Sequence, residues 1–142
     1  MIEKLDFLLG NWQLEYRVPK SSFSKADTGT GSGVFQRALN DRYVTFDYEC
    51  SLSGGDGAAH GIFARDEKLN NLRYWWFEDS GHFQEAACQI LEDGTLFMHW
   101  QQTMLKQTFR KEGEQVVLKM YTPLSETEDE LILEVIFTKD KV

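Results

Sequence analysis

Hydrophobic and polar residues alternate strictly along several segments of the chain. From Tyr43 to Leu52, every second residue after Val44 is apolar, and the residues between them are mostly Thr, Asp, Glu or Ser. Residues 11–18 alternate in the same way, with Trp12 and Tyr16 on the apolar face. Successive side chains of a strand point to opposite faces, so both segments are predicted to be strands with one face in a core.

Residues 72–78 differ because they are bulky on both alternating faces. Tyr74 and Trp76 lie on one face, and Trp75 and Phe77 on the other. A turn is predicted at residues 79–81, followed by a second strand over residues 82–92, which together make a hairpin. A strand that is bulky on both sides is either covered on both faces or lines a cavity. We interpret this hairpin as one wall of a ligand-holding barrel, with Trp76 on the inner face.

The remaining runs complete an all-β pattern. Further strands are predicted at residues 31–39, 60–65, 95–103, 106–111, 116–122 and 131–137, with loops at 19–30 (a candidate lid) and 123–130. A short helix is predicted over residues 2–9, because Leu5 and Leu8 share one face. Roughly ten strands joined by hairpins favour an antiparallel, up-and-down lipocalin-like barrel with an N-terminal helix over a sandwich. We expect residues 1–142 to form a single domain.

Composition and charge narrow the function classes. A net charge of −8 over 142 residues leaves no cationic surplus for nucleic acid or for an anionic membrane surface. The N-terminus does not resemble a signal peptide, and no apolar stretch is long enough to span a bilayer. A cytoplasmic location is therefore expected, and Cys50 and Cys88 are expected to be free thiols.

The segment Gly10-Asn11-Trp12, directly after the predicted helix, resembles the N-terminal signature of the calycin superfamily. This superfamily contains lipocalins, fatty-acid-binding proteins and nitrobindin-like domains. The resemblance implies that Trp12 plugs one end of the barrel beneath a basic side chain from a late strand. Arg110 and Lys139 are both candidates for that side chain.

Longer segments resemble a bacterial domain-of-unknown-function family with a lipocalin-like fold. They are residues 5–12, 29–33 and 60–66, and the resemblance extends over nearly the whole chain. It implies the fold but no activity. Nitrobindin-like domains hold haem through a late-strand histidine and carry Gly-x-Trp-x-Gly. Here Leu14 replaces the second glycine and no histidine follows His99, so we expect no cofactor.

The residues most often used in catalysis form no known motif. His60, His82 and His99 lack metal-ligand spacing, so no metal site is expected. Glu78 and Glu85 flank the central turn and could face one another as an acid–base pair in an apolar cavity, or lie on a solvated rim. The chain carries no nucleophile, phosphate-loop or dinucleotide signature, and we expect no catalytic residue.

Bulky inward residues make up the candidate ligand site. Either they fill the interior, or they line an apolar pocket with a few polar groups such as Gln84, Gln102 and Gln107. The predicted ligand-binding residues are Tyr16, Phe46, Tyr48, Trp76, Glu78, Met98, Trp100 and Met120. We interpret the chain as a protein that binds a small hydrophobic molecule, elongated or planar. The alternatives are an isomerase- or cyclase-type enzyme that uses the same cavity, and a homodimerising interaction module with a packed interior.

Overall fold

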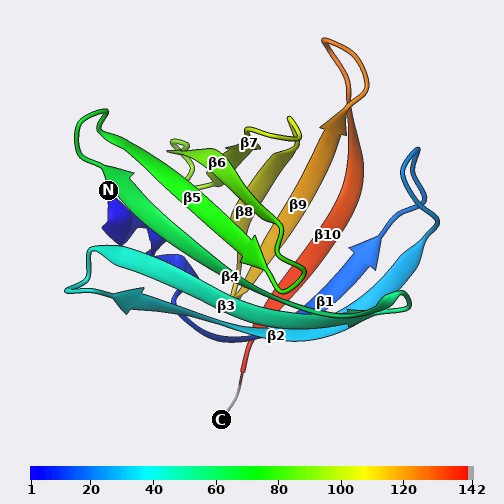
Figure 1. The fold of residues 1–142 in the computed structure, drawn as a ribbon, viewed down its shortest axis with the longest axis horizontal. Helices are drawn as coiled ribbons and strands as arrows, with labels where there is room; N and C mark the ends of the chain where they lie inside the picture. Colours follow the sequence, from blue (N-terminus) through cyan, green and yellow to red (C-terminus); the bar gives the residue numbers. More distant parts are fainter. Residues whose placement is uncertain (141–142) are drawn as a thin grey trace.

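The computed structural model describes residues 1–140, which fold into one closed sheet of ten antiparallel strands (Figure 1). Neighbouring strands in the barrel are consecutive in the sequence, and β1 pairs with β10 to close it. This confirms the predicted all-β, up-and-down barrel with one short N-terminal helix.

The elements follow in a simple order. They are η1 (Ile2–Leu8), β1 (Gly10–Val18), β2 (Asp27–Ala38), β3 (Tyr43–Leu52), β4 (Gly55–Asp66), β5 (Asn71–Glu78), β6 (Phe83–Ile90), β7 (Leu96–Trp100), β8 (Lys106–Glu112), β9 (Gln115–Pro123) and β10 (Asp129–Lys139). The helix η1 is a 3-10 helix. In the described part of the chain, no helix is both long and apolar enough to cross a membrane.

Two stretches predicted as loop or turn belong to strands instead. β2 begins at Asp27 rather than at residue 31, and β4 begins at Gly55 rather than near residue 60. The prediction failed because these strand starts are rich in glycine, which is rare in strands. A Cβ on Gly31 would clash with the Glu49 carbonyl oxygen of β3 and lie 3.2 Å from Tyr16 Cε1. A Cβ on Gly33 would lie 2.6 Å from Phe46 Cε1. Glycine therefore makes room for the β3 backbone at Gly31 and for an inward-facing aromatic ring at Gly33.

The helix η1 covers one end of the barrel, which we name the closed end (left in Figure 1). Leu5 and Leu8 are fully buried there. Trp12 Nε1 donates a hydrogen bond of 2.7 Å to the Leu8 carbonyl oxygen, so the indole ties β1 to the helix. The Trp12 ring also packs edge-on against Phe137, with ring centroids 6.1 Å apart.

Lys139 is the basic side chain beside Trp12. Its Nζ lies 4.4 Å from the centroid of the Trp12 ring and donates to the Leu9 carbonyl oxygen. Arg110, the other candidate, is instead largely exposed and lies 3.9 Å from an Asp93 carboxylate oxygen. Gly10 has φ +124°, a backbone conformation that residues with a side chain rarely adopt. A Cβ there would also come within 2.3 Å of Lys139 Nζ, so both the backbone conformation and the available space favour glycine.

The half of the barrel next to η1 is packed solid. Phe35 stacks on Phe46 with ring centroids 3.8 Å apart, and Phe109 and Phe137 meet edge-on at 5.8 Å. The fully buried residues of this half include Phe35, Val44, Phe63, Leu96, Met98, Val116 and Phe137. Of the two alternatives for the interior, the filled one therefore describes this half.

The opposite end, which we name the mouth, carries the turns that follow the odd-numbered strands β1 to β9 (right in Figure 1). The β1–β2 loop is shorter than the predicted lid, because β2 starts early. It is also attached to its neighbour: the Ser22 hydroxyl donates a 2.6 Å hydrogen bond to Glu130 at the start of β10. This loop therefore forms a fixed part of the rim.

The closed end gives a direct test of the helix attachment. Replacing Trp12 by alanine should lower the free energy of unfolding by about 3–5 kcal/mol, since it removes a buried large aromatic side chain. Trp12→Phe is the matched control, because it keeps a ring but loses the N–H, and it should cost about 1–3 kcal/mol. Urea unfolding monitors both variants, and a loss below about 1 kcal/mol for Trp12→Ala would contradict this role.

Candidate functional site

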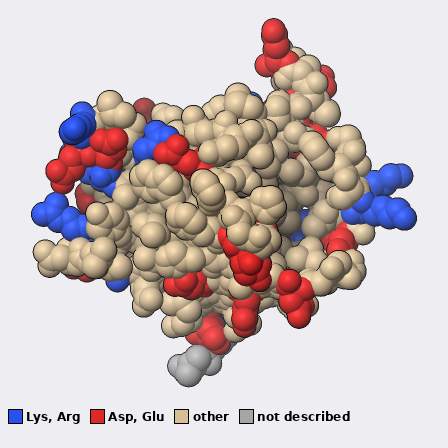
Figure 2. Space-filling view, in the orientation of Figure 1, with Lys and Arg blue, Asp and Glu red and all other residues tan. Residues whose placement is uncertain are grey.

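A cavity of about 260 Å³ occupies the half of the barrel nearer the mouth. Its wall is mostly aromatic and aliphatic. The lining residues are Tyr16, Phe46, Tyr48, Tyr74, Trp76, Gln84, Trp100, Leu105, Gln107, Phe109, Leu118, Met120, Leu133, Val135 and Phe137. Phe46, Phe109 and Phe137 also belong to the packed half, so they form the floor. The molecular surface is hollowed on the side of the mouth (Figure 2).

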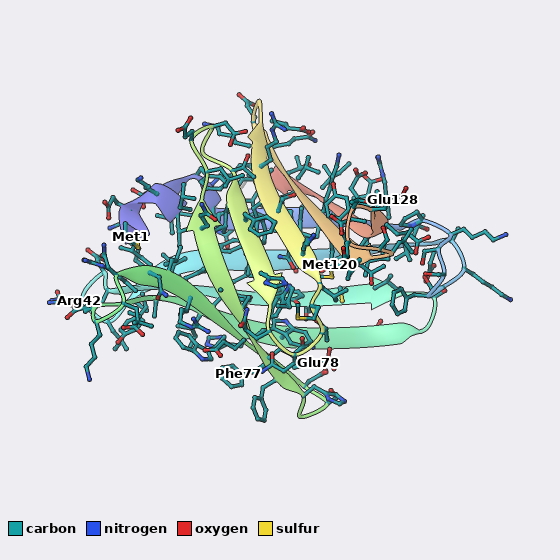
Figure 3. All side chains as sticks on the ribbon, turned by 90° about the horizontal axis from the view of Figure 1, so that it is seen from above. Met1, Arg42, Phe77, Glu78, Met120 and Glu128 are labelled. Atoms are coloured by element: carbon teal, nitrogen blue, oxygen red, sulfur yellow. The ribbon has the colours of Figure 1, made fainter. Side chains whose placement is uncertain are left out.

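Most of the predicted ligand-binding residues meet on this wall. The structure brings together Tyr16, Phe46, Tyr48, Trp76, Trp100 and Met120. Met98 faces inward but lies outside the wall, fully buried and paired across the strands with the wall residue Gln107. Glu78 also lies outside the wall, at the last position of β5, where it accepts a hydrogen bond from Ser80; Figure 3 labels it together with Met120. Alternation along a strand thus identified the inner face but not the height of each residue in the barrel.

Of the two alternatives for Glu78 and Glu85, the facing acid–base pair is excluded. The hairpin pairs Phe77 with Phe83 and places Glu85 opposite Trp75, so Glu85 lies on the outer face. There its Oε2 accepts a hydrogen bond of 3.0 Å from Arg73 Nε. The two carboxylates are on opposite faces because the register is set by the turn, which sequence alternation alone does not determine.

Gln102 is also not a polar group of the cavity. It lies on the exposed β7–β8 turn, and its Oε1 accepts a hydrogen bond of 3.1 Å from the Glu85 backbone N–H. Gln84 and Gln107 do line the wall, as predicted for polar groups of a pocket.

Sequence reasoning missed several lining residues. Leu118, Val135 and Phe137 lie on inner faces that the alternation had marked as apolar, so the same signal could have found them. Leu105 follows β7 in a turn, and its carbonyl oxygen accepts a 2.9 Å hydrogen bond from the Trp100 N–H. Its position depends on the turn rather than on strand alternation, so no pattern in the sequence indicated it.

Two tryptophan N–H groups are satisfied within the wall. Trp76 Nε1 donates to the Tyr48 hydroxyl oxygen at 2.7 Å, and Trp100 Nε1 donates to Gln107 Oε1 at 3.0 Å. The two indole rings meet edge-on, with centroids 6.2 Å apart. These contacts hold the aromatic rings in fixed positions, so the wall is largely preformed.

Tyr74 reaches the cavity by leaning across the neighbouring strand. A Cβ on Gly61 of β4 would come within 1.8 Å of the Tyr74 hydroxyl oxygen. Glycine at this position therefore allows the phenol to lie against the backbone of β4. The Tyr74 ring also packs edge-on against Trp100, with centroids 5.8 Å apart.

The cavity wall is electrically neutral. No Asp, Glu, Lys, Arg or His belongs to the wall formed by the described residues. Burial raises the pKa of Tyr48 to about 12, and it also raises the pKa values of Tyr16 and Tyr74. All three phenols are therefore uncharged at neutral pH and can act as hydrogen-bond donors.

The histidines and cysteines lie apart. His60 pairs with Asp47 across β3 and β4 on the exposed outer face. Within residues 1–140, no three His, Cys, Asp or Glu side chains are grouped closely enough to hold a metal ion. Cys50 and Cys88 are free thiols, and burial raises the pKa of both, to about 12 for Cys88, so neither is activated as a thiolate.

Comparison with solved structures shows where this barrel occurs elsewhere. The chain is similar to Rv2717c from M. tuberculosis, with a TM-score of 0.68 and 11% identity over 99% of this chain and 97% of that chain. It is equally similar to the S-type phycobiliprotein lyase CPES from Guillardia theta, with a TM-score of 0.68 and 10% identity over 99% and 92%. A de novo designed fluorescence-activating β-barrel matches with a TM-score of 0.52 and 11% identity over 99% and 100%.

At these identities the likeness extends to the fold alone. The neighbours share with this chain a barrel over nearly its whole length. No family model matches the chain, and no curated protein matches it by sequence.

Burial of the phenols has a consequence at alkaline pH. A tyrosine in an unfolded chain has a pKa of about 10, so between about pH 10 and the higher folded pKa the unfolded state loses protons that the folded state keeps. The stability contributed by each buried phenol is complete below about pH 10 and is lost as the pH rises toward the folded value, about 12 for Tyr48. The free energy of unfolding should therefore fall above pH 10. Each buried phenol should contribute about 1.4 kcal/mol to this fall for every pH unit.

Urea unfolding at a series of pH values measures this fall. Tyr48→Phe removes one titrating group and should make the decline less steep above pH 10. A free energy of unfolding that stays constant from pH 9 to pH 11 would show that these phenols ionise as easily in the folded chain as in the unfolded one.

Proposed function

We propose that this protein binds a small, largely apolar molecule in the cavity of the barrel. The observation that carries the proposal is the preformed, uncharged aromatic wall in one half of the barrel, above a solid floor in the other half. Ligand sites are typically concave, mostly apolar and provided with a few polar groups that fix orientation. The volume of about 260 Å³ lies just below the usual range of about 300–1,000 Å³, which favours a compact ligand.

The structural neighbours support the same interpretation by analogy. One is described as a phycobiliprotein lyase and another as a designed fluorescence-activating barrel, so barrels of this architecture occur in proteins with such described activities. Fold alone does not carry function, and the argument for this chain rests on its own cavity. Membership in the bacterial domain-of-unknown-function family and a cytoplasmic location remain predictions from the sequence.

An enzyme that uses the same cavity is the first alternative. In the described part of the chain, the ionisable groups on the wall are the three phenols, all with raised pKa values. An isomerase or cyclase would have to work with neutral phenols as acids or hydrogen-bond donors, because Glu78 lies outside the wall. We therefore place binding ahead of catalysis.

A homodimer is the second alternative. Phe77 and Phe83 are 44% and 70% exposed on the central hairpin, with ring centroids 6.3 Å apart. This pair is a small apolar patch on the outer face of the barrel. A dimer formed through this patch would leave the cavity free, so it is compatible with a ligand inside the barrel.

Two adjacent tryptophans provide a matched test of the cavity. Trp76 lies on the wall, whereas Trp75, the next residue, faces outward opposite Glu85. We expect Trp76→Leu to weaken the binding of a neutral naphthyl ketone dye at least tenfold, because it removes a large part of the aromatic wall and the N–H that orients Tyr48. Trp75→Leu should change the affinity less than twofold.

Dye emission and quenching of tryptophan emission measure the affinity, and circular dichroism verifies that both variants fold. If the dye does not bind the parent protein, or if both variants bind it equally well, the cavity is not the binding site.

A further inference from the structure

The hydrogen bond between Trp76 and Tyr48 has a fixed direction. An indole N–H can only donate, so the Tyr48 oxygen is the acceptor and its own hydrogen must point elsewhere. Within residues 1–140, no protein group accepts that hydrogen. Since Tyr48 lines the cavity, its O–H is a donor available to whatever the cavity holds.

Further groups on the wall offer donors: Tyr74, Gln107 and Gln84, whose amide can also accept. Tyr74 is only 4% exposed, and within the described chain its hydroxyl group has no hydrogen-bond partner. The hydroxyl oxygen nevertheless keeps some accessible surface, so a molecule in the cavity can reach it. Gln107 accepts from Trp100 through Oε1, which turns its NH₂ group away from that ring. One contact of this NH₂ group is Met98 Sδ at 3.7 Å, a weak acceptor. The wall therefore presents hydrogen-bond donors that lack good acceptors.

Leaving such donors buried without acceptors costs free energy. A ligand with an acceptor oxygen would satisfy them, while a plain hydrocarbon would leave them unpaired. Discrimination of this kind is strong in proteins, because the penalty falls on the polar groups of the site.

The same wall disfavours a charged ligand. An anion would lose its hydration without meeting a cationic side chain, since no lysine, arginine or histidine lines the described cavity. At the mouth, Glu78 ends β5 near Tyr48 and would repel an anion further. Lys20 and Lys25 of the β1–β2 loop are exposed beyond the rim. A cation would be attracted by the aromatic faces but would lose its hydration without meeting a carboxylate on the described wall.

The volume limits the size. A dry apolar cavity of about 150 Å³ accommodates benzene, so about 260 Å³ suits a molecule of two fused rings. Longer or larger molecules would have to extend through the mouth.

We infer that the cavity selects an uncharged, compact aromatic or polycyclic ligand that presents a carbonyl-type acceptor to the hydroxyl groups of Tyr48 and Tyr74. This inference rests on the proposed binding function and specifies its ligand class. The recognition is directional: the aromatic wall supplies apolar contact, and the phenols supply the hydrogen bonds that orient the ligand.

Four probes with the same two-ring body separate the possibilities: naphthalene, acetylnaphthalene, naphthoate and naphthyltrimethylammonium. Their affinities at neutral pH are measured by isothermal titration calorimetry on the whole chain. We expect acetylnaphthalene to bind at least tenfold more tightly than each of the other three.

Variants of the donor groups show which contacts cause this preference. Tyr48→Phe should reduce the preference for acetylnaphthalene over naphthalene on the order of tenfold, while the affinity for naphthalene changes less than twofold. Tyr74→Phe provides a second test that leaves the acceptor of Trp76 in place. It should act in the same direction, and circular dichroism confirms folding of each variant.

Several results would overturn the inference. Tighter binding of naphthoate would point to an anionic ligand held by Lys20 or Lys25, and tighter binding of naphthyltrimethylammonium would point to an aromatic cage for a cation. Equal binding of naphthalene and acetylnaphthalene would leave the proposed binding function intact but remove the role of the donors. Absence of binding by all four probes would overturn both proposals.

Discussion

A barrel of ten strands encloses more space than the side chains of its inner face can fill, and this constraint governs the rest of the structure. Barrels of about eight strands are just wide enough to be filled by their own residues or to hold one small ligand. In this chain, η1, Trp12 and the phenylalanines use the extra width at the closed end. At the mouth no such element is present among the described residues, and the remaining space is the cavity. The solid floor and the hollow half at the mouth thus have one cause: the extra width of the barrel is filled at only one of its two ends.

Glycines and aromatic rings divide the inner face between them. Gly33 and Gly61 lie where a Cβ would strike Phe46 or Tyr74, and a Cβ on Gly31 would strike the backbone of β3 and crowd Tyr16. The rings can therefore lie against the backbone of β2 and β4 instead of filling the centre of the barrel. Because the wall is built from rings and phenols rather than carboxylates or amines, the cavity is uncharged, and burial keeps its phenols protonated. The ligand class inferred above follows from these two properties.

The sequence revealed much of the fold and less of the site, because alternation shows which face of a strand a residue occupies but not its height in the barrel or the strand register. Strict alternation identified β3 with its observed bounds and placed Trp76 inside. It could not reveal the early start of β2, whose glycines are explained only by the rings and backbone of other strands. Alternation also does not report height along the barrel, which depends on tilt and stagger, so Glu78 was assigned to the pocket although it lies at the end of β5, outside the wall. The register of the central hairpin depends on its turn, and so the sequence could not decide whether Glu78 and Glu85 face one another.

The central claim is that the half of this barrel nearer the mouth is a preformed site with an uncharged wall and oriented donors. A crystal structure of the protein soaked with acetylnaphthalene tests it most directly. The account predicts density for the two rings between Trp76 and Trp100, with the carbonyl oxygen within hydrogen-bond distance of the Tyr48 or Tyr74 hydroxyl. Side chains that close into the cavity and leave no room for the probe, or a probe bound outside the barrel, would contradict it.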